Sequence, residues 1–164
     1  MRALAVQFYD VVVWLHVSAV VLAFGPTFAF GIYLAVTQQK HPRSIPAVLD
    51  AQTVVSRTMV TIGMVVVLAS GLYLAADRWD FSEVFIGIGI VAILALFGLV
   101  HGFFLPNDRR TKELAERDIE ASGPGDVKFS DEFTKRSNAS ARVGSLAGVI
   151  VILTIYFMAA KPFL

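Results

Sequence analysis

Two histidines, His16 and His101, lie inside long stretches of sequence that contain no charged residue. An imidazole is a common ligand of haem iron and of other transition metals, and it can exchange a proton near neutral pH. Polar groups inside apolar stretches are costly unless they find a partner, so they mark candidate functional positions. We therefore take His16 as the first candidate ligand of a metal or cofactor, and His101 as the second.

Two further residue types could contribute to such a site. Arg57 precedes the second charge-free stretch, where a guanidinium either anchors the helix at the membrane surface or binds an anion such as a haem propionate. Methionine thioethers suit a soft copper ion. Met64 is the candidate of this kind, and packing in the core is the alternative interpretation. The chain has no cysteine, which excludes disulfides and thiolate ligands.

The charges of the chain are strongly segregated. No Asp, Glu, Lys or Arg occurs in four gaps of 29, 19, 24 and 18 residues, which follow Asp10, Arg57, Glu83 and Arg142. About 20 apolar residues suffice for a helix to cross a hydrocarbon core of roughly 30 Å. The pattern predicts an all-α fold: one membrane domain over residues 1–164, built as an antiparallel transmembrane four-helix bundle. The predicted spans are Val11–Val36, Val54–Ala76, Val84–Leu105 and Ser140–Ala160.

The first apolar run is longer than the 7–15 residues typical of a signal peptide, and no A-x-A site follows it closely, so we expect it to remain as the first span. The loop 107–139 is the one sizeable polar connection and is predicted to be partly helical. Its Ser122-Gly123-Pro124-Gly125 segment interrupts helix-forming sequence, and Ser130-Asp131-Glu132 is typical of a new helix start.

The distribution of basic residues predicts the orientation. Loops one and three with the adjoining helix ends carry 11 of the 14 Lys and Arg residues, whereas the termini and loop two carry three, namely Arg2, Arg78 and Lys161. Cytoplasmic loops are enriched in Lys and Arg. We therefore expect loops one and three in the cytoplasm and both termini outside it, in the inner membrane if the protein is bacterial. The net charge of +1 gives no indication of a nucleic-acid partner.

Small residues predict where the helices pack, because helices in lipid associate through close van der Waals contact. Pro26 should bend the first span, because a proline inside a helix removes a backbone hydrogen bond. The bend either serves packing alone or lines a cavity. The predicted packing residues are Gly25, Pro26, Gly71, Gly98, Gly102, Gly144 and Gly148.

His16 should face the interior of the bundle, because it shares a helical stripe with Ala19, Ala23 and Thr27. It lies about 9 Å from the outer end of its helix, and His101 lies about 27 Å from that side, so the two imidazoles should not meet at one metal. Tyr73 and Tyr156 are candidate hydrogen-bond partners for His16 if it holds no cofactor. No acidic residue lies within a predicted span, which argues against a proton-coupled multidrug exporter.

Two short motifs carry a family resemblance. Trp14-Leu15-His16, with Gly25 nine residues after the histidine, resembles the first helix of the copper-resistance-D-like membrane proteins. Arg57 leads a helix that ends with Ser70-Gly71-Leu72. This helix resembles the second helix of those proteins, which has an arginine-rich start and a Thr-Gly-Leu end. Ala23 stands where relatives carry a tryptophan, and Ser70 where they carry a threonine.

The bacterial membrane protoporphyrinogen oxidase has a similar first helix. In length, the chain fits best a large uncharacterised family of predicted four-helix integral membrane proteins. The resemblance implies binding of haem b or copper, and by residue match it assigns a ligand role to His16.

Three functions remain open from the sequence. The first is a haem- or metal-binding, redox-associated membrane protein that uses His16. The second is a cofactor-free structural or assembly subunit of a larger membrane complex, and the third is a small oligomeric channel or carrier. In each case the lipid bilayer is a partner, and we expect a homo-oligomer or a subunit of a complex. The sequence identifies no catalytic residue and no reaction.

Overall fold

The computed structural model describes residues 7–162; residues 1–6, among them Arg2, and 163–164 lie outside the described part. Its elements in chain order are α1 (Phe8–Phe24), α2 (Thr27–Lys40), the 3-10 turn η1 (Pro42–Ser44), α3 (Ile45–Val55), the π-turn η2 (Ser56–Val60), α4 (Thr61–Arg78), α5 (Val84–Leu99), the π-turn η3 (Val100–Phe104), α6 (Leu105–Ala121) and α7 (Asp131–Ala160). The segment 7–162 contains no strand, and the predicted all-α class is confirmed.

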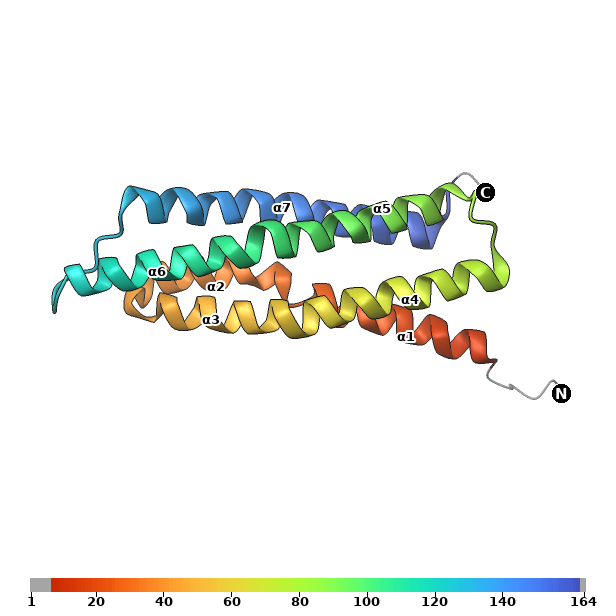
Figure 1. The fold of residues 1–164 in the computed structure, drawn as a ribbon, viewed down its shortest axis with the longest axis horizontal. Helices are drawn as coiled ribbons and strands as arrows, with labels where there is room; N and C mark the ends of the chain where they lie inside the picture. The colour runs from red at the N-terminus through yellow and green to blue at the C-terminus, as the bar shows by residue number, and fades with distance from the viewer. Residues whose placement is uncertain (1–6, 163–164) are drawn as a thin grey trace.

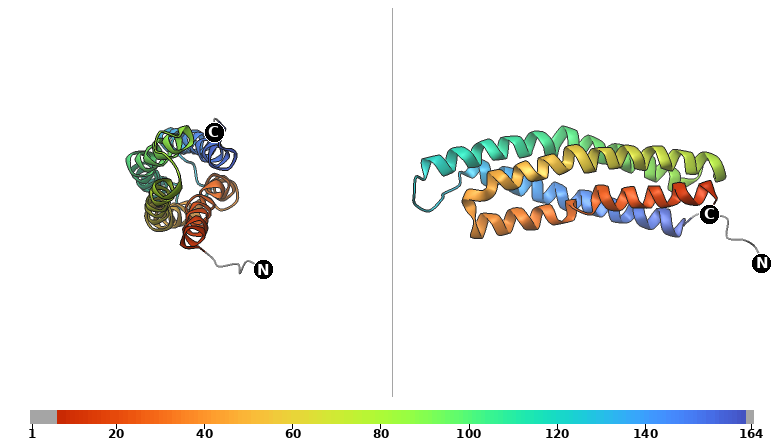
Figure 2. Two further views of the ribbon diagram at one scale, coloured as in Figure 1. Left: turned by 90° about the vertical axis from the view of Figure 1, so that its right-hand side faces the viewer. Right: turned by 90° about the horizontal axis from the view of Figure 1, so that it is seen from below.

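These elements join into four long rods that run antiparallel to one another (Figure 1). The rods Phe8–Lys40, Pro42–Arg78, Val84–Ala121 and Asp131–Ala160 are each long and apolar enough to cross a membrane. We call the end of the bundle where α1 begins and α7 finishes the terminal end, and the opposite end the polar end. Seen along the bundle axis, the helices surround a common centre (Figure 2).

The first rod is interrupted at Gly25-Pro26, as the position of the proline predicts (Figure 1). A Cβ at Gly25 would lie 2.6 Å from the carbonyl oxygen of Val21, so only glycine fits where the chain leaves α1. The hydroxyl of Thr27 donates to the carbonyl of Phe24 at 2.7 Å, which satisfies one backbone oxygen released by the break.

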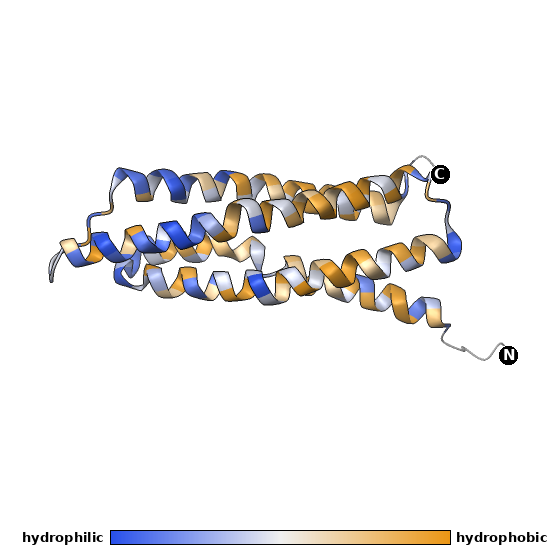
Figure 3. Cartoon of the chain, in the orientation of Figure 1, coloured by the Kyte–Doolittle hydropathy of each residue, from blue (hydrophilic) through white to orange (hydrophobic). Residues whose placement is uncertain are grey.

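Hydropathy divides the bundle along its length (Figure 3). The third rod continues past the predicted end of its span as α6, in which nine of 17 residues are charged, so α6 projects from the membrane at the polar end. As predicted, a new helix begins after Ser130. Its hydroxyl accepts a hydrogen bond from the Phe133 N–H and caps α7.

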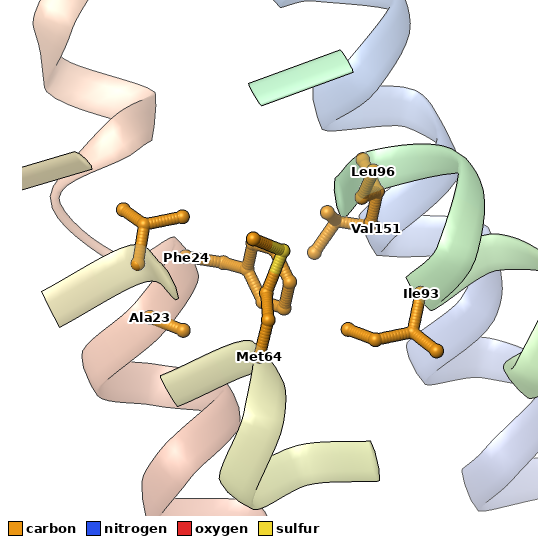
Figure 4. Packing of buried hydrophobic residues seen from close by; sticks show 7 residues of the cluster. Ala23, Phe24, Met64, Ile93, Leu96 and Val151 are labelled. Carbon is orange, nitrogen blue, oxygen red and sulfur yellow. The ribbon is translucent and has the colours of Figure 1, made fainter. Parts of the chain in front are cut away.

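Three hydrophobic clusters hold the rods together. The middle cluster joins all four rods through Ala23, Phe24, Val60, Met64, Ile93, Leu96 and Val151 (Figure 4). A second cluster around Phe133 and Leu114 packs α3, α6 and α7 at the polar end, and a third around Phe85 lies at the terminal end. Many large apolar side chains point outward instead, such as Trp14 and Val21, which is the arrangement expected for a protein surrounded by lipid.

The close helix contacts of the chain differ in part from the predicted set. A Cβ at Gly148 would lie 3.3 Å from the Phe28 ring, whereas a Cβ at Gly98, Gly102 or Gly144 would meet no atom within 4 Å. These three glycines therefore do not bring helices together within one chain, because the faces that they occupy are open. Close contacts between helices occur instead at Gly63, which lies against Ala23, and at Gly89, which lies against Met158.

A candidate ligand-binding cavity and its histidine

His16 lies on the face of α1 that packs against α4, and it forms a hydrogen bond to a side chain there. Its Nδ1 is 2.9 Å from Oγ of Ser70. The Ser70 hydroxyl donates its only proton to the carbonyl of Val66, so it must accept from the imidazole. The hydrogen-bond network thus assigns the proton of neutral His16 to Nδ1. Nε2 then carries a lone pair, and no hydrogen bond joins it to residues 7–162.

Small residues bring α1 close enough to α4 for this hydrogen bond. A Cβ at Gly71 would lie 3.1 Å from Cε1 of His16, and one at Gly63 would lie 2.6 Å from Cβ of Ala23. Ala19 and Ala23 are buried on the same stripe of α1. The small side chains therefore fix both the separation of the two helices and the position of the imidazole.

The half-buried His16 lines a cavity of about 480 Å³ that lies among α1, α4, α5 and α7. This volume is in the range of sites for small molecules and cofactors. Most lining residues are aliphatic, and Ile93, Leu96 and Val151 also belong to the middle cluster (Figure 4). The cavity therefore combines an apolar wall with one imidazole.

Aromatic and basic side chains line the cavity where it reaches the terminal end. Lys161, at the left-handed C-cap of α7, places Nζ 3.9 Å from the centre of the Trp79 ring. Tyr9 also lines the cavity, and its ring lies 3.8 Å from the guanidinium of Arg78. The terminal end thus offers cations beside aromatic rings, an arrangement typical of the membrane–water interface.

The other predicted site residues lie away from His16. Met64 is 1% exposed inside the middle cluster. His101 lies in η3, with Nε2 3.3 Å from Oγ1 of Thr61. Since Thr61 precedes Ser70 by nine residues on α4, the two imidazoles are separated by about 14 Å along the bundle.

Arg57 lies in η2 and lines a second pocket together with His101, in the half of the bundle nearer the polar end, so it does not share a site with His16. Across residues 7–162, no group of three or more His, Asp or Glu side chains is arranged to hold a metal ion.

The side chain that bonds to His16 is Ser70, and Tyr73 and Tyr156 do not take this role; they are 40% and 56% exposed. A signal for Ser70 is present in the sequence, because it follows Gly63 by seven residues and therefore lies on the same helical face. The π-turns at η2 and η3 have no comparable signal, since a single inserted residue changes neither composition nor length visibly.

Four membrane-length helices around an apolar cavity define a polytopic integral membrane protein. The chain belongs to the family described as "Predicted integral membrane protein (DUF2269)", which matches residues 10–162. Neither a curated protein nor a solved structure matches the chain. The family match agrees with the predicted membership in an uncharacterised membrane family, and the wider relationship to the copper-resistance-D-like proteins stays a prediction.

Proposed function

We propose that this membrane protein binds haem, or a lipophilic metal cofactor of similar shape, in the cavity at the terminal end, with His16 as the protein ligand. One observation carries the proposal: His16 lines an apolar cavity with Nδ1 engaged by Ser70 and Nε2 without a hydrogen-bond partner among residues 7–162. Metal-ligating histidines typically donate the proton of the other ring nitrogen in this way, which fixes the tautomer.

The residues of the cavity fit a haem in two respects. Aliphatic side chains from four helices suit the apolar body of the porphyrin, and the ammonium of Lys161 beside Trp79 suits an anionic propionate edge at the membrane surface. Arg57 cannot serve that edge, because it lines the second pocket and not the cavity with His16. A bound haem supplies one-electron redox chemistry.

Copper is the second candidate, since Met158 lines the same cavity as His16 and a thioether is a soft ligand. Met64 is a poorer partner for His16, because it is enclosed by the middle cluster.

An absorption spectrum and a metal analysis of the purified protein, taken before and after addition of haemin, test the proposal. We expect a Soret band from the parent protein and its loss in His16→Ala. His101→Ala is the matched control, because it removes the same group from a position that does not line the cavity. Stoichiometric copper without a Soret band would support the copper form. A colourless, metal-free protein that takes up no haemin would contradict the proposal and favour a structural subunit or an oligomeric channel.

A further inference from the structure

A basic pocket of about 360 Å³ lies in the half of the bundle nearer the polar end, and the function proposed above does not use it. The polar groups that line it are Arg57 and His101 from the two π-turns, and Arg109, Arg110 and Glu113 from α6. Leu105 and Pro106 complete its wall with apolar surface. Residues far apart in sequence therefore form one pocket.

The pocket lies at the depth where hydrocarbon gives way to lipid headgroups. Arg57 precedes Asp77 by 20 residues, or about 30 Å of helix, and His101 follows Glu83 by 18 residues, or about 27 Å. The hydrocarbon core is about 30 Å thick, so both side chains lie near its boundary. Arg109 is eight residues beyond His101, about 12 Å further out and within the headgroup layer.

The charges of the pocket leave an excess of cations. Glu113 pairs with both neighbouring arginines, at 3.3 Å to Arg109 and 3.1 Å to Arg110. Arg57 is exposed and makes no ion pair or hydrogen bond through its side chain with any residue that the structure describes. Three guanidinium groups thus face one lining carboxylate, although Glu132, outside the pocket, pairs with Arg110 at 3.6 Å. A guanidinium at the edge of the hydrocarbon needs a counter-charge, and its planar donors match a phosphate.

The two π-turns are joined across the helix interface and hold the membrane-side wall of the pocket. The Thr61 hydroxyl donates to the carbonyl of Ser56 at 2.8 Å, which leaves its oxygen to accept from Nε2 of His101 at 3.3 Å. The His101 ring also packs against Phe97, with a centroid distance of 4.4 Å. Such π-turns frequently occur at functional sites, and here two of them place one cationic and one titratable side chain beside the same pocket.

We propose that this pocket binds the phosphate group of an anionic phospholipid. The cation excess selects a negatively charged headgroup, the depth matches that of a lipid phosphate, and the apolar wall of Leu105 and Pro106 suits the adjoining glycerol and acyl chain. The same phosphate chemistry could be supplied by free phosphate in solution, but the position at the hydrocarbon boundary favours a lipid.

Native mass spectrometry of the delipidated protein, titrated with phosphatidylglycerol or phosphatidylcholine, tests this proposal. We expect tighter binding of phosphatidylglycerol. In the double variant Arg57→Gln, Arg109→Gln its affinity should fall about 25-fold, because each basic residue contributes a factor of about five, or about 1 kcal/mol. Phosphatidylcholine binding should not change. The double variant Lys135→Gln, Arg142→Gln removes the same charge from exposed positions on α7 outside the pocket and should behave as the parent.

Thermal unfolding shows whether the variants are folded. If the double variant unfolds, two single variants replace it: Arg109→Gln and Arg57→Lys. The Arg109 side chain is 80% exposed, so its loss should not disturb the fold. The first should weaken phosphatidylglycerol binding about fivefold, and the second should keep most of it because it keeps the charge. Equal affinity of parent and Arg109→Gln, or no preference for phosphatidylglycerol, would overturn the proposal. Displacement of phosphatidylglycerol by excess inorganic phosphate would assign the pocket to free phosphate instead.

Discussion

His16 occupies a position in which the neutral imidazole carries its proton on Nδ1. Ser70 accepts its Nδ1–H, and Gly71 leaves space for the ring edge, so two adjacent residues of α4 set both the chemistry and the position of the side chain. An imidazole in hydrocarbon without such a partner would lose its hydrogen bonds at a cost of several kcal/mol. The pair therefore forms a structural unit whether or not a cofactor binds.

The substitution Ser70→Ala tests this unit. It removes the acceptor and leaves a half-buried N–H without a partner, which we expect to lower the free energy of unfolding by about 1–3 kcal/mol. If His16 is a ligand, cofactor affinity should also fall about 10- to 100-fold. The measurement is thermal unfolding in detergent, followed by cofactor titration. Ser145→Ala is the control, because that hydroxyl is exposed and bonds only to Ala141 of its own helix; an equal loss in both variants would contradict the role of Ser70.

At the scale of elements, the charge-free runs, Pro26 and Ser130 predict the four rods, the break in the first rod and the start of α7. These features are local, since they depend on hydropathy, a missing N–H and a cap. The π-turns η2 and η3 and the partners of each glycine could not be predicted, because they depend on how neighbouring helices are rotated about their axes. One extra residue in a turn rotates every later side chain by about 100° relative to an unbroken helix. For this reason the sequence identifies Arg57 and His101 separately but not their shared pocket.

Two glycines on α7, one turn apart, give opposite expectations. Gly148→Leu should push α7 away from Phe28 and lower the free energy of unfolding by about 1–3 kcal/mol through overpacking. Gly144→Leu should leave the fold stable, because a side chain there meets open space. Thermal unfolding of both variants in detergent checks the packing. If the predicted homo-oligomer uses the open face, Gly144→Leu will change the size of the particle on gel filtration and Gly148→Leu alone will lower its stability.

The carboxylate of Asp118 holds the connection between α6 and α7 through hydrogen bonds, which makes that connection sensitive to pH. It lies on the charged α6, outside the apolar spans. Burial raises the pKa of its carboxyl group, but hydrogen bonds from the Ser130 N–H at 2.8 Å and from the Arg117 guanidinium at 3.0 Å outweigh this effect and hold the pKa below its usual value. Because the pKa of Asp118 is lowered in the folded state, its ionised carboxylate stabilises the fold at every pH above the pKa of the unfolded chain, which is about 4. This stabilisation is lost as the pH falls through the pKa of the folded state.

We therefore expect Asp118→Asn to lower the free energy of unfolding at neutral pH by about 1–2 kcal/mol. The difference between parent and variant should shrink below about pH 4. Thermal unfolding between neutral and acidic pH measures both effects. Asp126→Asn, at an exposed carboxylate of the same connection, should show neither. A difference between Asp118→Asn and parent that stays constant with pH would contradict the assigned ion pair and hydrogen bonds.

At the scale of the whole molecule, the two candidate sites lie in opposite halves of one bundle. The cavity with His16 lies in the half nearer the terminal end, and the basic pocket lies in the half nearer the polar end, with the middle cluster between them. The same asymmetry holds for the charges, because loops one and three meet at the polar end, as Figure 3 shows. The fold thus gathers at one end the 11 basic residues that are spread over two loops and the adjoining helix ends in the sequence.

This asymmetry predicts the orientation in the membrane. Lys and Arg close to span ends are retained on the cytoplasmic side, and the polar end carries 11 such residues against three for the termini and loop two. We therefore expect the polar end to face the cytoplasm and both termini to lie outside it. Fusions of a reporter that is active only outside the cytoplasm should be active at Leu164 and inactive at Gly123, and a fluorescent protein that matures only inside should give the reverse pattern. A cytoplasmic signal at Leu164 would overturn the orientation and would place the His16 cavity on the cytoplasmic side.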